Sequence, residues 1–162
     1  MDLMKKNVMM AFLVLAELAV IGSANTTMPS FATNAAQYSN YLVETTDKSV
    51  ELTRQYQDEI GLWNQGKYSN STMAKITDSF LPRFISQLST FNSTQAPEEY
   101  NVIKENFAKS FASEIKSYEL FKEYLITNNS TKNDLSTDYL SNALNYETIA
   151  RNAFAQLNSN TK

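Results

Sequence analysis

Residues 100–125 read YNVIKENFAKSFASEIKSYELFKEYL, and this stretch decides the fold class. Large apolar side chains recur in it every three or four residues, which is the period of an amphipathic α-helix. They are Tyr100, Ile103, Phe107, Phe111, Tyr118, Phe121 and Leu125. Pro97 precedes the stretch, and Glu98 and Glu99 follow the proline at positions that suit the first turn of a helix. The pattern predicts one long helix from Pro97 to about residue 127.

The same period predicts two further long helices, one near the start and one at the end of the chain. The first opens at Pro29 with Ser30 as its N-cap, ends near Trp63, and is followed by a turn at Gly66. Its predicted apolar positions are Tyr38, Leu42, Leu52, Tyr56, Ile60 and Trp63. The last helix begins near Asp134. Its predicted core face is Leu135, Tyr139, Ala143, Tyr146, Ala150, Phe154 and Leu157, with Glu147 and Arg151 as an i,i+4 pair.

A shorter helix is predicted between residues 71 and 91, capped by Ser71 or Thr72. Its apolar positions are Met73, Ile76, Phe80, Leu81, Phe84, Ile85, Leu88 and Phe91. Pro82 lies inside it, and a proline removes one backbone hydrogen bond and clashes with the preceding turn. We therefore expect either a kink at Pro82 or two short helices.

Four amphipathic helices joined by short polar loops predict an all-α domain, an antiparallel up-down four-helix bundle over residues 33–162. The composition agrees, because the 162 residues include only three glycines and three prolines, too few for the many turns of an all-β fold. Apolar residues make up 43% of the chain, which is enough for a buried core. The long helices would give a bundle about 40 Å long at 1.5 Å per residue.

The N-terminus has the pattern of a secretory signal. Lys5 and Lys6 precede a nearly continuous apolar run over residues 8–21, and small residues follow at 22–24. The alternative is that the segment is an uncleaved membrane anchor. Residues 8–24 are 17 residues long, which is the lower limit for a membrane span, and inserting Glu17 into the bilayer costs about 2.5–3.5 kcal/mol. We predict residues 1–24 to be a signal peptide or anchor and 25–32 a linker, which places the domain outside the cytoplasm, secreted or anchored at the outer face of the membrane.

Five asparagines stand in Asn-x-Ser/Thr sequences, namely Asn25, Asn70, Asn92, Asn128 and Asn129. The last four fall in segments predicted to be loops between helices, where a glycan would not disturb the core. These positions are predicted glycosylation sites; the alternative is that asparagine and serine are ordinary loop and cap residues.

The chain contains neither cysteine nor histidine, which excludes several kinds of catalytic and metal-binding site. A disulfide, a cysteine nucleophile, a Ser-His-Asp triad and a structural zinc site all need one of these residues. The net charge of −3 leaves no basic excess for nucleic acid. We therefore expect that the protein is not an enzyme and binds neither a cofactor nor a metal.

Glu119 and Glu123 stand one helical turn apart, where a pair of carboxylates can hold a hard cation, but a solvated acidic face explains this spacing better.

Polar residues interrupt the apolar stripes at similar depth in two predicted helices. Thr45 and Ser49 lie in the first helix, and Ser110 and Glu114 in the third. If they face one another, they line a polar pocket in which Arg83, just after Pro82, pairs with Glu114. The alternatives are a buried polar layer that fixes helix register and a stripe that drifts so that these residues face solvent.

Aromatic residues are abundant, with nine Tyr, nine Phe and one Trp. Tyrosines on helices can bind a flat ligand or another protein, but aromatic stripes at helical spacing are usually core.

The third and fourth predicted helices also resemble a pattern in small uncharacterised exported or membrane-anchored helical-bundle proteins of archaea and some bacteria. The segments that carry the resemblance are Pro97-Glu-Glu-Tyr100, Phe107-x-x-Ser110, Glu114 to Phe121 and Glu123-Tyr-Leu125, within residues 95–157. The resemblance implies an extracytoplasmic bundle and transfers no catalytic residue.

The sequence favours an extracytoplasmic interaction or structural module, an accessory subunit of a membrane or envelope complex. Its expected partner is another protein or a second copy of the chain, with membrane contact through residues 8–24 if that segment is uncleaved. The alternative is an extracytoplasmic bundle that binds or senses a small molecule in the polar pocket.

Overall fold

The computed structural model describes residues 34–159, which form four α-helices and one short 3-10 helix. The helix α1 spans Ala35–Asn64, α2 spans Asn70–Ser93, α3 spans Asn101–Thr127 and α4 spans Ser130–Ser159, while η2 (Glu98–Tyr100) leads into α3. No strand occurs between residues 34 and 159. The prediction of an all-α chain is confirmed. The predicted signal or anchor, the linker over 25–32, Asn25 and the expected cap Ser30 lie outside the described residues.

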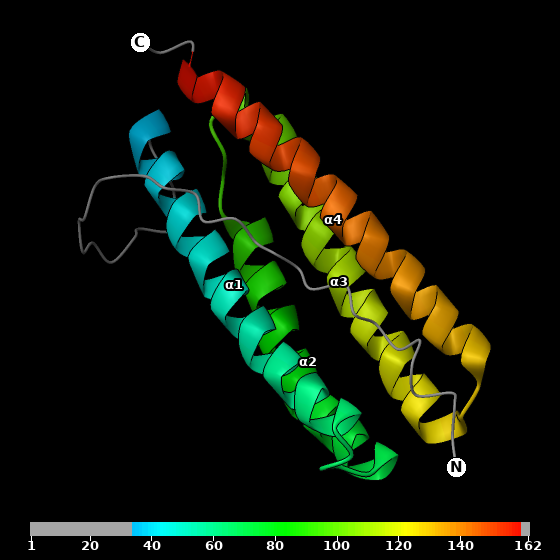
Figure 1. The fold of residues 1–162 in the computed structure, drawn as a ribbon. Coiled ribbons are helices and arrows are strands. Elements are labelled where there is room, and N and C mark those ends of the chain that lie inside the picture. Colours follow the sequence, from blue (N-terminus) through cyan, green and yellow to red (C-terminus); the bar gives the residue numbers. More distant parts are fainter. Residues whose placement is uncertain (1–33, 160–162) are drawn as a thin grey trace.

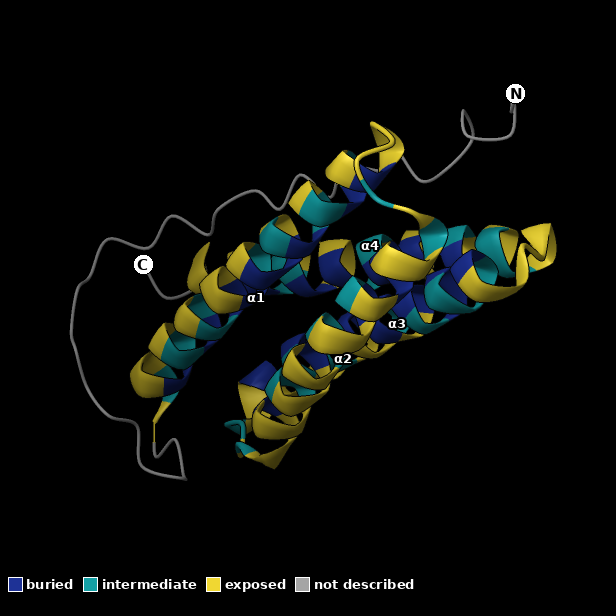
Figure 2. Cartoon of the chain, turned by 90° about the horizontal axis from the view of Figure 1, so that it is seen from below, coloured by how far each residue is buried: buried dark blue, intermediate teal, exposed yellow. Residues whose placement is uncertain are grey.

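The helices form a bundle in which each one runs back along the one before it (Figure 1). Close backbone approaches join α1 with α2, α2 with α3 and α3 with α4, and the last pair is the most extensive. Their buried faces turn toward one another and their exposed faces turn outward (Figure 2). No helix of this part of the chain is both long enough and apolar enough to span a bilayer.

Side-chain caps set where α1 and α2 begin. The Asn34 side chain accepts a hydrogen bond from the backbone N–H of Gln37 at 2.9 Å, so α1 starts at Ala35. The Ser69 hydroxyl accepts from the N–H of Thr72 at 3.1 Å, so α2 starts before the predicted cap positions. The turn between the two helices contains Gly66 at φ 77°, as its sequence position predicts.

The connection between α3 and α4 is shorter than the sequence predicts. Asn128 ends α3 in the left-handed region at φ 54°, a conformation that asparagine tolerates better than most residues. The side chain of Asn129 then accepts from the N–H of Thr131 at 3.0 Å. The helix α4 therefore begins at Ser130, four residues before Asp134, the predicted start.

Pro82 lies within α2, which is one uninterrupted helix of 24 residues. Of the two alternatives predicted at Pro82, two short helices is therefore wrong, and a kink within one helix stays a prediction. The proline faces solvent, so its ring does not enter the core.

Two aromatic clusters form the core, one at each end of the bundle. The cluster beside the α1–α2 turn comprises Leu52, Tyr56, Ile60, Trp63, Met73, Ala74, Phe84, Ile115, Tyr118, Phe121 and Leu125. The cluster at the other end comprises Tyr38, Leu42, Phe91, Tyr100, Ile103, Phe107, Phe111, Ala150 and Phe154. Most aromatic side chains are thus core residues. Between the two clusters lies a layer that includes the buried polar residues Ser49, Ser110, Glu114 and Glu147.

Small side chains explain the close packing of α3 on α4. The Ser110 hydroxyl donates to the carbonyl oxygen of Ala143 at 2.9 Å, and the hydroxyls of Ser117 and Ser136 lie 3.1 Å apart. A helix can approach its neighbour closely only where such small residues stand at the contact. This contact fixes which face of α4 is buried.

Candidate functional site

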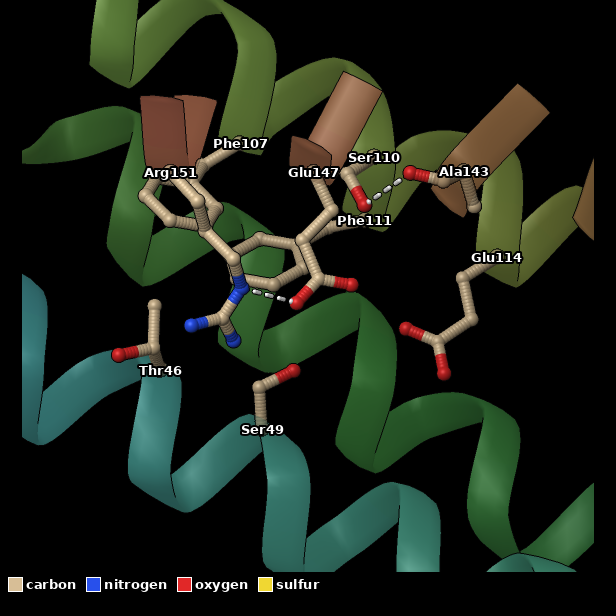
Figure 3. A pocket seen from close by; sticks show the side chains of 9 residues that line it. All are labelled: Thr46, Ser49, Phe107, Ser110, Phe111, Glu114, Ala143, Glu147 and Arg151. Carbon is tan, nitrogen blue, oxygen red and sulfur yellow. Dashed lines mark hydrogen bonds and ion pairs between the residues drawn. The ribbon is translucent and has the colours of Figure 1, made fainter. Parts of the chain in front are cut away.

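A polar cavity lies between the two aromatic clusters, where α1 faces α3 and α4 (Figure 3). It has a volume of about 20 Å³, which is room for one or two water molecules. Its lining residues are Thr46, Ser49, Phe107, Ser110, Phe111, Glu114, Ala143, Glu147 and Arg151.

Glu114 is the most deeply buried charged group of this layer, with 5% of its surface exposed. Its Oε1 accepts hydrogen bonds from the hydroxyl of Thr53 on α1 at 2.7 Å and from that of Tyr118 on α3 at 2.5 Å. Burial raises the pKa of the Glu114 carboxyl, the two hydrogen bonds oppose the rise, and the nearby charge of Glu147 adds to it. The site therefore contains a carboxyl that takes up a proton more readily than an exposed glutamate does.

Glu147 and Arg151 on α4 form a largely buried ion pair at the other side of the cavity. Arg151 Nε donates to Glu147 Oε1 at 2.6 Å, across one helical turn. Burial raises the pKa of Glu147, and the hydrogen bond and charge of Arg151 oppose that rise. Both side chains point from α4 toward α1 (Figure 3).

These three groups leave the polar layer with an unbalanced charge. Two ionised carboxylates and one guanidinium, Glu114, Glu147 and Arg151, sum to −1. A buried net charge is unfavourable, so uptake of one proton is the simplest way to balance it.

Ser49 is a largely buried residue of this cavity. Only 5% of its surface is exposed, and it lies on α1 opposite the α4 ion pair (Figure 3). Thr46, one turn earlier, is satisfied within its own helix, since its hydroxyl donates to the carbonyls of Leu42 and Val43 at 2.8 and 2.9 Å. The cavity has room for a water molecule beside Ser49.

The structure brings together three of the five residues that the sequence predicts for the pocket. Ser49, Ser110 and Glu114 all line the cavity. Thr45 does not, and the adjacent Thr46 takes its place. Thr45 is only half-buried, and its carbonyl accepts from the side chain of Gln87 on α2 at 3.3 Å. The helix period of 3.6 residues accounts for this shift of one position.

The predicted pairing of Arg83 with Glu114 is wrong. Arg83 lies on the exposed side of α2, where it donates to the side chain of Gln55 at 2.9 Å and lies 4.9 Å from the centre of the Phe80 ring. A guanidinium on the outer face of a helix keeps its hydration, which a position beside buried Glu114 would remove. The cation of the polar layer is Arg151 instead.

Glu147 and Arg151 were not predicted as site residues, because the stripe predicted for α4 departs from its buried face at several positions. The buried positions are Ser136, Leu140, Ala143, Glu147, Ala150 and Phe154. Three of them, Ala143, Ala150 and Phe154, agree with the prediction, whereas Leu135 and Tyr139 are exposed. The clue in the sequence is that Ala143 and Ala150, whose small side chains permit the close approach of α3, stand on either side of Glu147.

The predicted glycosylation positions do not all lie in loops. Asn70 is the first residue of α2, where it accepts from the indole N–H of Trp63 at 3.0 Å and donates to the side chain of Asn128 at 3.2 Å. Asn92 is exposed in the last turn of α2, so the loop assignment is wrong for Asn70 and Asn92. Asn128 and Asn129 do form the loop between α3 and α4.

The acidic pairs of the sequence stand at the surface. Glu119 forms an ion pair with Lys116 at 3.1 Å, and Glu123 forms one with Lys132 at 2.6 Å. Glu98 and Glu99 are exposed in η2. Each of the two helical glutamates thus has a lysine partner.

The outer surface of α4 is a second candidate site because it combines apolar side chains with very little charge. Leu135, Tyr139 and Ile149 are exposed there. Between residues 139 and 159 the only charged side chains are Glu147 and Arg151, which pair with each other. The outer face of α1 is different, because it bears Glu44–Lys48 and a network of Glu51, Arg54 and Asp58.

The chain matches no family model, no curated protein and no solved structure. The function is therefore inferred from the residues of the two candidate sites.

Proposed function

We propose that this protein is an extracytoplasmic helical interaction module, an up-down four-helix bundle exported or anchored by residues 1–24. The observation that carries the proposal is the outer surface of α4, which exposes Leu135, Tyr139 and Ile149 and whose residues 139–159 carry no charge other than the Glu147–Arg151 pair. The signal-like pattern of residues 1–24 supports a location outside the cytoplasm.

The contrast between α1 and α4 is the physical basis of this proposal. Charged residues are depleted at the centre of protein interfaces, because each charge must lose its hydration there, and tyrosine is enriched. The ion-paired face of α1 is typical of a surface that stays in water. The α4 surface instead exposes Leu135, Tyr139 and Ile149. Two aspartates are exposed beside the first two, but the Glu147–Arg151 pair holds the only charged side chains between residues 139 and 159.

The test is photo-crosslinking in the cells that make the protein. A photoreactive amino acid at Ile149 should capture one partner chain of defined mass, since Ile149 is 41% exposed on the apolar surface of α4. The same group at Asp47, exposed on α1, is the matched control. Equal or absent capture from both positions would contradict the proposal.

A second candidate function is the binding of a small ligand in the polar cavity, favoured by the polar side chains of Ser49, Ser110 and Glu114 that line it. The present volume of about 20 Å³ admits a water molecule or a single ion, and any larger solute requires α1 to move away from α3 and α4. A thermal-shift screen of solutes against the wild type and Ser49→Val tests this idea. A solute that stabilises both chains equally does not bind at the cavity.

A further inference from the structure

The exposed apolar residues of α4 belong to a regular stripe. Its six positions are Leu135, Tyr139, Asn142, Tyr146, Ile149 and Ala153, spaced alternately by four and three residues. This spacing is that of a coiled-coil seam, in which apolar positions repeat every 3.5 residues on average. The buried face of α4 uses the neighbouring positions against α3. The helix therefore carries two seams. One is covered by α3, whereas the second leaves Leu135, Tyr139 and Ile149 exposed and Tyr146 and Ala153 half-buried, with Ala153 also packed against the core.

The stripe is complementary to itself in one antiparallel register. When two copies of α4 are related by a two-fold axis beside residue 144, Leu135 faces Ala153 of the second copy and Tyr139 faces its Ile149. Asn142 faces Tyr146 in the same way. Each layer then pairs a larger side chain with a smaller one, which lets the two faces interdigitate. Because α4 runs from Ser130 to Ser159, this register also aligns the two helices over their whole length.

The charges around the stripe fit a second copy better than a charged partner. On the α3 side, Lys109 pairs with Glu105 at 2.7 Å and lies 5.8 Å from the centre of the Tyr146 ring. Lys116 is likewise paired with Glu119. Asp134 and Asp138 are exposed beside Leu135 and Tyr139. In the antiparallel register they lie against residues 150–154 of the second copy, which include Arg151 and no acidic residue. The register therefore brings no like charges together, which favours the isologous contact of a two-fold dimer.

The size of the surface bounds the strength of this contact. A helix of 30 residues is about 45 Å long, and a face about 10 Å wide gives roughly 450 Å² per copy. The total of about 900 Å² lies at the low end of specific protein interfaces, among weak and transient complexes. We therefore expect an exchanging dimer with a dissociation constant on the order of micromolar or weaker.

We propose that two copies of the chain pair through α4, antiparallel, in the register that places Tyr139 against Ile149 of the partner copy. This inference rests on the proposed function and names the partner of the same surface.

The absence of cysteine from the chain makes a register-specific test possible, because one introduced thiol is unique. Full-length Tyr139→Cys and Ile149→Cys chains are mixed in dilute non-ionic detergent under mild oxidation. The mixture should form a disulfide-linked dimer of one chain of each kind. Each variant alone should crosslink at least several-fold more slowly, since identical positions lie about 15 Å apart along the paired helices. Asp47→Cys measures random collision, and circular dichroism verifies that every variant is helical.

Two results would overturn the register. A mixture that crosslinks no faster than Asp47→Cys rules out α4 pairing, and a Tyr139→Cys chain that crosslinks fastest with itself requires a different arrangement. The failure of this inference is distinguishable from that of the proposed function. If the thiol mixtures fail but the photoreactive group at Ile149 still captures a different chain, the surface is an interface for another protein and self-pairing is wrong.

Discussion

The hydroxyl of Thr53 on α1 donates a hydrogen bond to the carboxylate of Glu114 on α3 at 2.7 Å, inside the bundle. The contact joins two helices that are not neighbours in sequence. It lies next to the cavity and between the two aromatic clusters, so it fixes how α1 meets α3 at the middle of the bundle. Polar contacts of this kind specify register as well as adding stability.

Replacing Thr53 by valine tests this contact. Valine keeps the shape but leaves buried Glu114 with one donor instead of two, which should lower the free energy of unfolding by about 1–3 kcal/mol. Chemical denaturation measures the change. Thr90→Val is the matched control, because Thr90 is exposed on α2 and donates only to a carbonyl of its own helix, that of Ser86. A loss as large in the control as in Thr53→Val would contradict the role of the buried contact.

The stability contributed by Glu114 and Glu147 should fall as the pH rises through the folded-state pKa values of these two groups. Burial raises both pKa values above those of the unfolded chain, so the folded state binds more protons over this interval. The stabilisation from these groups is complete below the unfolded pKa, near 4.3, and is lost as the pH increases. Urea unfolding at a series of pH values from 4 to 8 measures the slope.

Glu114→Gln isolates the contribution of one carboxyl to that slope. Glutamine keeps an acceptor oxygen for Thr53 and Tyr118 but does not titrate. The difference in stability between variant and wild type should shift in favour of the variant as the pH rises. Exposed carboxyls titrate equally in both chains and cancel in this difference. A difference that stays constant with pH would show that Glu114 titrates like an exposed glutamate.

Removing the proline from α2 should stabilise the protein. Pro82 lies inside a continuous helix on its exposed side, so alanine there restores a backbone donor without altering the core. The cost of proline in a helix interior is about 3 kcal/mol, and we expect Pro82→Ala to recover part of it. Thermal unfolding of Pro82→Ala and of the exposed α2 variant Ser86→Ala makes the comparison. A lower melting temperature for Pro82→Ala would mean that α2 needs the local bend of a proline.

The two asparagines of α2 should respond differently to substitution. Asn70→Gln disturbs the hydrogen bonds to Trp63 and Asn128 that link the α1–α2 turn to the end of α3, and should cost about 0.5–1.5 kcal/mol. Asn92 is exposed, so Asn92→Gln should change the unfolding free energy much less. Equal effects of the two variants would rule out a structural role for the Asn70 contacts.

The helical character of the chain could be predicted because the apolar period in each segment is strong and breakers are few. The residues at which the helices begin were harder to predict, because serine, threonine and asparagine occur at many positions. The caps Asn34 and Ser69 stand among other residues of the same kind. Half of the polar pocket was predictable from the interruption of the α1 and α3 stripes. The α4 half was not, because a ranking by side-chain size selects Leu135 and Tyr139 for the core.

The actual contact between α3 and α4 is made by serine and alanine, so the buried face of α4 follows from close packing rather than from hydrophobicity. The position of Arg83 could not be predicted from the sequence either, because its partner Gln55 is 28 residues away along the chain.

The most direct test of pairing through α4 is the molar mass of the full chain measured by sedimentation equilibrium over a range of concentrations, in density-matched detergent. The monomer has a mass of 18.3 kDa. We predict that the wild-type mass rises toward twice this value with increasing concentration, whereas Ile149→Glu, which places a charge on the stripe, stays monomeric. The same mass for both chains at every concentration would contradict the account.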